Sequence, residues 1–293
     1  MRPSGGPHRV TGRTLDAVTT VLLLRHGRTT ANADGILAGW TPGVFLDDSG
    51  RAQAADLARR LAVVPLAAVV TSPLQRCQET AEALVAVTGP GGAPRPRPVV
   101  EERLGECRYG DWTGRALKDL AKDPLWRVVQ AHPSAVTFPG EAGESMLGMQ
   151  HRAVRAVREH DARIGARYGD EAVWLAVSHG DVIKAIVADA LGMHLDTFQR
   201  LVIDPCSVSV IRYTALRPFV LRINDTGGDL AGLVPARPRR RAGTRRRRVA
   251  AESDAVVGGG DTPVAAVPGS GPAAVPASAP GSGGRRASPT ATP

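Results

Sequence analysis

The sequence predicts an α/β fold, a three-layer sandwich in which helices cover both faces of a mostly parallel central sheet. Two observations lead to this prediction. Short, continuous apolar runs occur at residues 18–24, 66–71 and 172–177, and such runs are typical of parallel strands that are buried on both faces. A segment with helical spacing of its apolar residues follows each run, and strands that alternate with helices indicate a doubly wound sheet.

The first strand and the first helix are predicted within residues 18–62. The strand covers residues 18–24 and leads into Arg25-His26-Gly27. After a glycine-rich connection, residues 48–62 place their apolar side chains on one helical face. Asp48 or Ser49 is in position to cap this helix.

The second strand, residues 66–71, runs directly into a second predicted helix. Ser72 is a favourable N-cap, Pro73 suits the first helical position, and Gln75 completes the pattern of a capping box. The pattern therefore predicts a helix that begins at Pro73, with Arg76 in its first turn.

The rest of the domain continues the alternation. A loop rich in proline and glycine at 88–98 precedes a short strand, a long helix, a third apolar strand and another helix, and two β segments joined by a tight turn predict a hairpin at a sheet edge. The predicted ranges are 99–100 for the short strand, 144–168 for the long helix, 172–177 for the third strand, 182–191 for the following helix, and 207–213 and 217–223 for the hairpin.

Positive charge is concentrated outside this alternating region. The 293 residues carry a formal charge of +9, of which residues 235–293 hold +7 and residues 1–16 hold +2, so the stretch between them is close to neutral. Eight arginines fall within 237–248, and no helical or strand period follows them. We expect a flexible leader at 1–17, one folded domain at 18–225, and a disordered tail rich in Arg, Ala, Pro and Gly at 226–293.

Cysteine spacing and hydropathy indicate the cellular compartment in which the protein is expected. The three cysteines, Cys77, Cys107 and Cys206, are widely spaced, which suits a reducing cytosol better than a disulfide framework. No apolar run has the length of a membrane span, and the N-terminal residues lack the apolar core of a secretory signal. We expect a cytoplasmic protein with no membrane association, and the sequence leaves its oligomeric state open.

Two predicted strands lead into a histidine followed by a glycine, at His26-Gly27 and at His179-Gly180. Ligands of open α/β sheets bind beyond the carboxyl ends of strands, and neighbouring strands lie about 4.8 Å apart, so the two imidazoles can face one small anion. Arg25 lies beside the first histidine, and Arg76 lies near a helix N-terminus, which also attracts anions. Two arginines and two histidines at one point suit a phosphate group better than an apolar ligand.

Four segments occur in an order and spacing that match a known family. They are RHGRTTAN at 25–32, SPLQRCQETA at 72–81, LGECRYGDWTG at 104–114 and SHG at 178–180. Together they resemble the histidine phosphatase superfamily, with its phosphoglycerate-mutase-like fold, over roughly residues 18–225, and within it an actinobacterial branch of phosphomutases and phosphatases. The resemblance implies a metal-independent phosphate monoester hydrolase that forms a phosphohistidine, acts on a small phosphorylated metabolite and needs no cofactor.

The resemblance also implies roles for single residues. His26 matches the nucleophile that becomes phosphorylated, and Arg25, Arg76 and His179 match the residues of the phosphate pocket. Phosphoryl transfer requires neutralisation of charge on the equatorial oxygens, which two arginines and a protonated His179 would supply. A neutral His26 can attack in line and divide hydrolysis into two easier steps.

Three further positions match the family pattern, and one departs from it. Asn32 and Thr29 match secondary phosphate contacts, and Glu106 matches the proton-donating carboxylate. Glu106 must be protonated to donate to the leaving oxygen and ionised to activate water, and partial burial would raise its pKa in the required direction. Arg28 stands where many members have Glu, which bears on substrate preference.

Three alternatives compete with a phosphatase. A mutase of the phosphoglycerate type would use the same chemistry, although His179 follows Glu106 by 73 positions, a connection that resembles that of the shorter-capped phosphatases. A metalloenzyme using His26, His179 and Asp181 would leave both arginines unexplained. The Arg-rich tail could bind nucleic acid non-specifically, but residues 235–293 contain no aromatic side chain for base stacking.

Other features are better explained by packing. Cys77 and Cys107, next to Arg76 and Glu106 in sequence, are predicted to be small buried residues. Trp112 is predicted to pack beneath the pocket. Residues 138–149 could form part of a substrate lid, and a loop followed by a helix cap explains them equally well.

Overall fold

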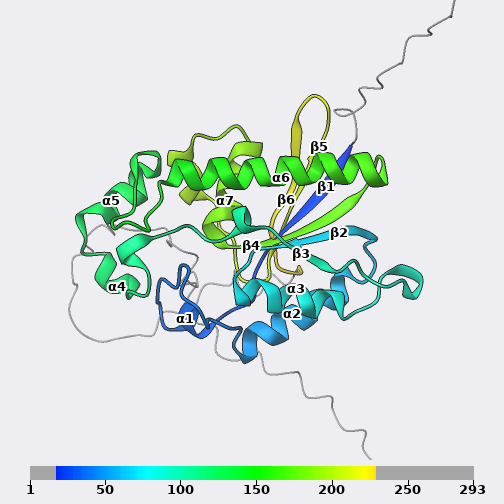
Figure 1. Cartoon of the computed structure of the whole chain (residues 1–293), viewed down its shortest axis with the longest axis horizontal. Coiled ribbons are helices and arrows are strands. Elements are labelled where there is room, and N and C mark those ends of the chain that lie inside the picture. Colours follow the sequence, from blue (N-terminus) through cyan, green and yellow to red (C-terminus); the bar gives the residue numbers. More distant parts are fainter. Residues whose placement is uncertain (1–17, 229–293) are drawn as a thin grey trace, which may run out of the picture. The chain divides into compact units, whose positions relative to one another are not determined.

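The computed structural model describes residues 18–228, so the predicted leader at 1–17 and the predicted tail from 229 onward lie outside the described residues (Figure 1). The strands are β1 Thr19–Arg25, β2 Leu66–Thr71, β3 Pro98–Val100, β4 Val173–Ser178, β5 Val208–Tyr213 and β6 Pro218–Asp225. The α-helices are α1 Thr30–Ala33, α2 Asp48–Leu61, α3 Gln75–Val85, α4 Leu117–Leu120, α5 Pro124–Ala131, α6 Met146–Tyr168 and α7 Gly180–Ala190.

The described strands form one six-stranded sheet in the order β3-β2-β4-β1-β5-β6. β1 pairs with β4 in parallel, as β2 does with β4 and with β3, whereas β5 pairs antiparallel with β1 and β6. The predicted hairpin therefore occupies one edge of a mixed sheet. In the β1–β4 register Arg25 lies opposite Ser178, so the two His-Gly pairs leave the sheet side by side.

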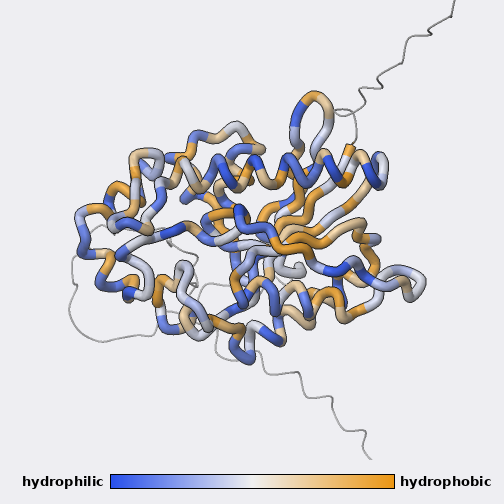
Figure 2. Tube along the Cα trace, in the orientation of Figure 1, coloured by the Kyte–Doolittle hydropathy of each residue, from blue (hydrophilic) through white to orange (hydrophobic). Residues whose placement is uncertain are grey.

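Helices cover both faces of the sheet, which confirms the predicted sandwich (Figure 1). Alternate residues of β1 divide between two apolar cores: Val21 and Leu23 join the residues of α6 and α7, and Leu22 and Leu24 join those of α2 and α3. Figure 2 shows the strands as the apolar centre of the domain, with mixed polarity along the helices. Burial on both faces explains why these strands are continuous apolar runs.

Two predicted helix starts were wrong. The side chain of Asp47, rather than Asp48 or Ser49, caps α2 by accepting from the Gly50 N–H. Helix α3 begins at Gln75 with Leu74 as its N-cap, and no side chain caps it. Ser72 does not cap this helix, because its hydroxyl contacts the ring of His179, which follows β4.

Three short helices have no counterpart in the prediction. α1 begins four residues after His26, and α4 and α5 lie between the second and the third predicted helices. Trp112 is buried at the edge of this region, where its ring packs 6.1 Å from that of Trp126 and 5.5 Å from that of Phe138. Ser145 caps α6 by accepting from the Gly148 N–H, so part of segment 138–149 serves as a helix start.

Candidate active site

His26 lies immediately beyond β1, and both its backbone and its ring are fixed. Its N–H donates to Ser178 O at 3.0 Å, which extends the β1–β4 ladder by one residue. Ring atom Nδ1 lies 2.8 Å from Gly27 O, and because a carbonyl only accepts, Nδ1 carries the proton and Nε2 the lone pair. Burial, with smaller effects of Arg76 and Arg25, lowers the pKa of His26 well below 6.5, so the ring is neutral at pH 7.

Two glycines allow α2 to approach this turn closely. A Cβ on Gly27 would lie 2.6 Å from Gly50 O, and a Cβ on Gly50 would lie 2.0 Å from Arg28 O. Both obstacles are backbone atoms, which cannot rotate aside as a side chain can. A side chain at either position would force the His26 turn and the start of α2 apart.

Arg76, the second residue of α3, lies against the nucleophile candidate. Its Nε donates to His26 Nε2 at 3.3 Å, and its Nη2 donates to Gly39 O at 2.9 Å. Thr80 joins the same two segments, because its hydroxyl donates to Arg76 O and accepts from the Gly27 N–H. The guanidinium is thus held beside the ring nitrogen that bears the lone pair.

Arg25, the last residue of β1, is 1% exposed. Its Nη1 donates to Ile203 O at 2.7 Å. Its positive charge lowers the pKa of both His26 and His179, so the guanidinium is close enough to act on both rings.

His179 follows β4 and is the N-cap residue of α7. Its ring is fully buried, and the ring centroids of His179 and His26 lie 5.2 Å apart with 62° between the planes. Ser72 Oγ lies 2.7 Å from His179 Nε2 and accepts from the Leu74 N–H at 3.3 Å. The Ser72 hydroxyl proton is therefore available to Nε2, which leaves the Nδ1 proton on the side of the catalytic carboxylate candidate.

That carboxylate, Glu106, is held from several directions and is 2% exposed. Its Oε2 lies 3.9 Å from His179 Nδ1, and its Oε1 accepts from the Cys107 N–H at 2.9 Å. Its backbone oxygen accepts from Trp40 Nε1 at 2.6 Å and from Arg152 Nη2 at 2.9 Å. Glu106 is thus held beside the histidine pair.

The environment of Glu106 raises its pKa to about 7. Burial contributes most, the negative charge of Asp181 adds to it, and Arg76 opposes both. Asp181 is itself buried: its Oδ2 accepts from Tyr109 Oη at 2.9 Å, and its Oδ1 lies 3.6 Å from Lys184 Nζ. A carboxyl group with this pKa is present in both protonation states near neutral pH, as general acid–base catalysis requires.

The role expected from the sequence requires His179 to be protonated when a phosphate group is bound. Burial, followed by the charges of Arg76 and His26, lowers the pKa of His179 well below 6.5. The ring is therefore neutral while the pocket holds no anion. A phosphate dianion beside it would raise this pKa, since an opposite charge favours the protonated form.

Thr29 is the N-cap residue of α1, and Asn32 lies within this helix, shortly after His26. They form a capping box: Thr29 Oγ1 accepts from the Asn32 N–H, and Asn32 Oδ1 accepts from the Thr29 N–H at 3.1 Å. Arg28 points to α2, where its Nε pairs with Asp47 Oδ2 at 2.8 Å. The visible role of these three residues is to fix the turn.

Sequence reasoning missed the residues that position the site. Ser72, Trp40 and Arg152 each contact a candidate catalytic residue, and each lies far from its partner along the chain. Cys77 and Cys107 are buried, as predicted, and Cys77 Sγ lies only 3.4 Å from His179 Nε2. The pattern SPL in 72–74 was the one available signal, and it was assigned to helix capping.

Within residues 18–228 no group of three or more His, Cys, Asp or Glu side chains is arranged to hold a metal ion. His26 and His179 bond to backbone and hydroxyl groups, and Asp181 bonds to Tyr109. In the same range no helix is both long and apolar enough to cross a membrane.

The sheet and this cluster define a class of protein. A mixed α/β sheet that buries two arginines, two neutral imidazoles and a carboxyl of raised pKa at its parallel strand ends is an enzyme framework for phosphate esters. The histidine phosphatase superfamily (branch 1) model matches residues 21–226, and the chain belongs to this superfamily.

Several relatives support the assignment. A probable phosphoglycerate mutase of Cronobacter sakazakii is 28% identical over 218 residues, which are 73% of this chain and 94% of that protein. A glucosyl-3-phosphoglycerate phosphatase of Mycolicibacterium vanbaalenii is 32% identical over 186 residues, 62% of this chain and 78% of that one. Both names lie within the range of activities that the sequence motifs predicted.

Solved structures agree. YhfR of Bacillus stearothermophilus superposes with a TM-score of 0.60 and 30% identity, over 71% of this chain and 97% of that one. A mycobacterial glucosyl-3-phosphoglycerate phosphatase in complex with VO3 gives a TM-score of 0.59 and 26% identity, over 70% and 98%. The predicted superfamily, fold and phosphatase class are confirmed, and a phosphate ester as substrate fits them.

Proposed function

We propose that His26 is the phosphorylated nucleophile of a phosphate monoester hydrolase whose proton donor is Glu106. In this proposal Arg25, Arg76 and His179 hold the transferred phosphoryl group, with Thr29 and Asn32 as secondary contacts. The domain responsible is residues 18–225, and the reaction uses neither a metal nor a cofactor. The observation that carries the proposal is the cluster in which His26 Nε2 lies 3.3 Å from Arg76 Nε, while the neighbouring His179 lies 3.9 Å from the Glu106 carboxyl group, whose pKa is about 7.

In the first step the substrate phosphate binds between the two imidazoles. Arg25 and Arg76 neutralise charge on its oxygens, and both are fixed in advance by hydrogen bonds to backbone carbonyls. His26 Nε2 attacks phosphorus in line while the bond to the leaving oxygen breaks, and protonated Glu106 gives its proton to that oxygen. The products are phosphohistidine, an ionised Glu106 and the released alcohol.

In the second step the ionised Glu106 takes a proton from a water molecule. The oxygen of that water attacks phosphorus, the N–P bond breaks, and its electron pair returns to Nε2 as inorganic phosphate forms. Glu106 is then protonated again, and the enzyme has completed one cycle. The hydrogen bond from Nδ1 to Gly27 O keeps the same ring nitrogen directed at phosphorus throughout.

The substrate in this proposal is a small phosphorylated metabolite. Two relatives have names that specify glucosyl-3-phosphoglycerate and phosphoserine, which makes both compounds reasonable first candidates. The expected compartment is the cytoplasm, and the three buried cysteines, none of which is in a disulfide, suit its reducing conditions.

A phosphate-release assay tests the proposal. The full chain is incubated with p-nitrophenyl phosphate, phosphoserine, glucosyl-3-phosphoglycerate and 3-phosphoglycerate, in buffer with EDTA, and inorganic phosphate is measured. Phosphate release that survives chelation and is lost in His26→Ala supports the hydrolase. Exchange between 2- and 3-phosphoglycerate without phosphate release would show a mutase instead, and loss of activity with EDTA would show a metal-dependent enzyme.

A further inference from the structure

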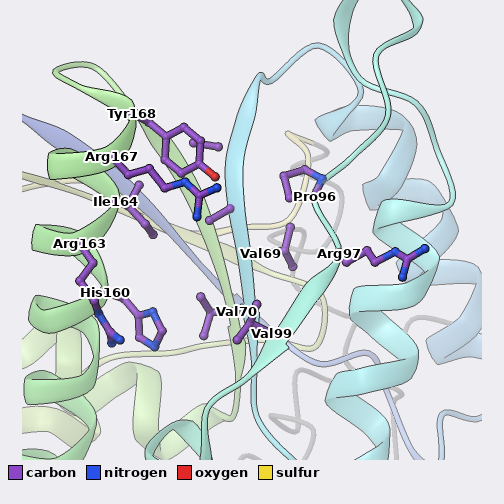
Figure 3. Close-up of a pocket in the computed structure, with 12 residues that line it drawn as sticks. Val69, Val70, Pro96, Arg97, Val99, His160, Arg163, Ile164, Arg167 and Tyr168 are labelled. Carbon is purple, nitrogen blue, oxygen red and sulfur yellow. The ribbon is translucent and has the colours of Figure 1, made fainter.

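A cavity of about 270 Å³ lies between the C-terminal half of α6 and the β3 edge of the sheet (Figure 3). None of the proposed catalytic residues lines it. Figure 3 shows side chains of α6 on one side and strand residues on the other. The lining residues come from three segments: Ala67, Ala68, Val69 and Val70 on β2; Pro96, Arg97 and Val99 at β3; and His160, Arg163, Ile164, Arg167 and Tyr168 on α6.

The floor of this cavity is apolar and open to solvent. Val70 and Ile164 are buried beneath it, whereas Val99 is 58% and Tyr168 is 49% exposed. The aliphatic and aromatic surface at the cavity therefore remains accessible to a ligand. Its burial by an apolar group would be favourable in proportion to the area covered.

The arginines of α6 fall into two groups. Three have a carboxylate partner: Arg152 with Glu144 at 2.6 Å, Arg155 with Glu159 at 2.7 Å, and Arg158 with Asp189 at 2.8 Å. The other two, Arg163 and Arg167, line the cavity and form no ion pair with a carboxylate in the described part of the chain. Arg163 Nε donates to a backbone oxygen, and Arg167 lies over the Tyr168 ring.

Arg163 and Arg167 lie one helical turn apart on the same face, where like charges repel each other. Arg167 is in the last turn of α6, where the carbonyl groups at the helix end stabilise a positive charge. Arg163 lies before this turn, so its charge is not stabilised in the same way. No acidic side chain lines the cavity. His160 pairs with Glu101 at 3.0 Å, and burial lowers its pKa, so the positive charge on the α6 side comes from Arg163 and Arg167, while Arg97 adds a third guanidinium group on the β3 side.

We propose that this cavity binds a small amphiphilic carboxylate. The guanidinium groups of Arg163 and Arg167 hold the carboxylate, for which their planar forks are suited, and the apolar body packs against Ile164 and Val99. The volume equals that of about nine water molecules in the liquid, so a ligand of roughly ten non-hydrogen atoms fits. Octanoate has this size and chemistry.

Calorimetric titration of the full chain tests the proposal. Octanoate, octylammonium and octan-1-ol have the same chain and differ in head-group charge. The titrations use buffer without inorganic phosphate, because phosphate would compete for guanidinium groups at either site. Hydrolysis of p-nitrophenyl phosphate that is not inhibited by octanoate shows that the carboxylate does not bind in the catalytic pocket. The proposal expects saturable 1:1 binding of octanoate, binding of octan-1-ol at least about tenfold weaker, and none of octylammonium. Absence of saturable octanoate binding, or equal binding of all three, would overturn it.

Substitutions on α6 test whether octanoate binds in this cavity. Arg163→Gln and Arg167→Gln should each weaken octanoate binding about tenfold, because each removes a charge-assisted hydrogen bond. Arg155→Gln is the matched control: it removes the same charge from the same helix, but Arg155 pairs with Glu159 outside the cavity. Val99→Glu should abolish binding, since it puts an anion on the floor. Equal losses in Arg155→Gln and Arg163→Gln, or no loss in either cavity variant, would refute the site. Hydrolysis of p-nitrophenyl phosphate by each variant checks that it is folded.

Discussion

The ends of β1 and β4 have the same local pattern, a histidine followed by a glycine, but the two rings are held in different ways. His26 is fixed by its own turn, through the hydrogen bond from Nδ1 to Gly27 O. His179 is fixed by a distant segment, through Ser72 Oγ on Nε2. As a result His26 presents Nε2 to Arg76, while His179 presents Nδ1 to Glu106.

This difference assigns separate chemistry to two side chains of one type. The lone pair of His26 faces the Arg76 guanidinium, where a bound phosphate would lie, so this ring is placed to attack phosphorus. His179 faces the Glu106 carboxyl group, so this ring is placed to orient the phosphoryl group and the acid. Both rings have a lowered pKa, so charge alone does not distinguish them. The hydrogen-bonding partner of each ring makes the distinction.

The largest effects are expected when each histidine ring is removed in turn, which tests whether His26 and His179 have different roles. We expect His26→Ala to lower kcat by at least about 10⁴-fold, since the nucleophile is lost, and His179→Ala to lower it by about 10²–10³-fold, since one stabilising group is lost. Reaction at neutral pH with ³²P-labelled substrate, followed by rapid quenching in alkaline denaturant, should trap an acid-labile, alkali-stable adduct in His179→Ala and none in His26→Ala. An adduct in His26→Ala would mean that the two roles are exchanged.

Replacement of Glu106 tests the role of the proton donor independently of the role of the nucleophile. Glu106→Gln should slow hydrolysis of an alkyl phosphate by about 10²–10⁴-fold, because its leaving oxygen needs a proton, and should slow p-nitrophenyl phosphate much less during phosphorylation of His26. Single-turnover kinetics isolates this step. An equal loss for both substrates would remove Glu106 from the role of proton donor.

Ser72→Ala tests whether the distant partner orients His179. With its hydroxyl gone, the buried Nε2 has lost its closest bond, and we expect kcat to fall about tenfold with little change in KM. Cys77→Ala is the control, because Sγ also lies near Nε2 but is a weak hydrogen-bonding group, and its effect should stay within about twofold. A larger effect of Cys77→Ala than of Ser72→Ala would reverse this assignment.

The pH profile provides the smallest and most specific test. If Glu106, with a pKa of about 7, is the proton donor as we propose, kcat/KM for an alkyl phosphate should fall above this pH. Asp181→Asn removes a negative charge that raises this pKa and retains an oxygen that can accept from Tyr109. The alkaline limb should therefore move to lower pH, whereas Asp189→Asn on the surface should leave it in place. An unmoved limb in Asp181→Asn would show that Asp181 has no electrostatic effect on the acid.

The strands that carry the site, and the location of the site at their ends, could be predicted because the signals are local. Apolar runs mark β1, β2 and β4, and the residues that follow each run meet at one sheet edge through parallel pairing. The contacts among His26, Arg76 and His179 follow from that topology. The short helices α1 and α4 were missed because four residues show no clear periodicity.

Roles set by distant partners could not be predicted. Ser72 matches a helix cap in sequence, but its hydroxyl is bound by His179, which lies 107 residues further along the chain. The protonation of His179 likewise depends on complete burial, which no local pattern reveals. Asp181 was considered as a metal ligand, and only the fold shows that it faces Tyr109 and acts on Glu106.

The two buried arginines have a consequence for turnover. In the proposed mechanism Arg25 and Arg76 would bind a phosphoryl group whether it belongs to an ester or has just been cleaved, because the ester and free phosphate present the same oxygens. Orthophosphate is therefore expected to compete with the ester and to leave slowly. The rate in a cell would then depend on the local orthophosphate level as well as on the supply of ester, so this enzyme would work fastest when phosphate is scarce.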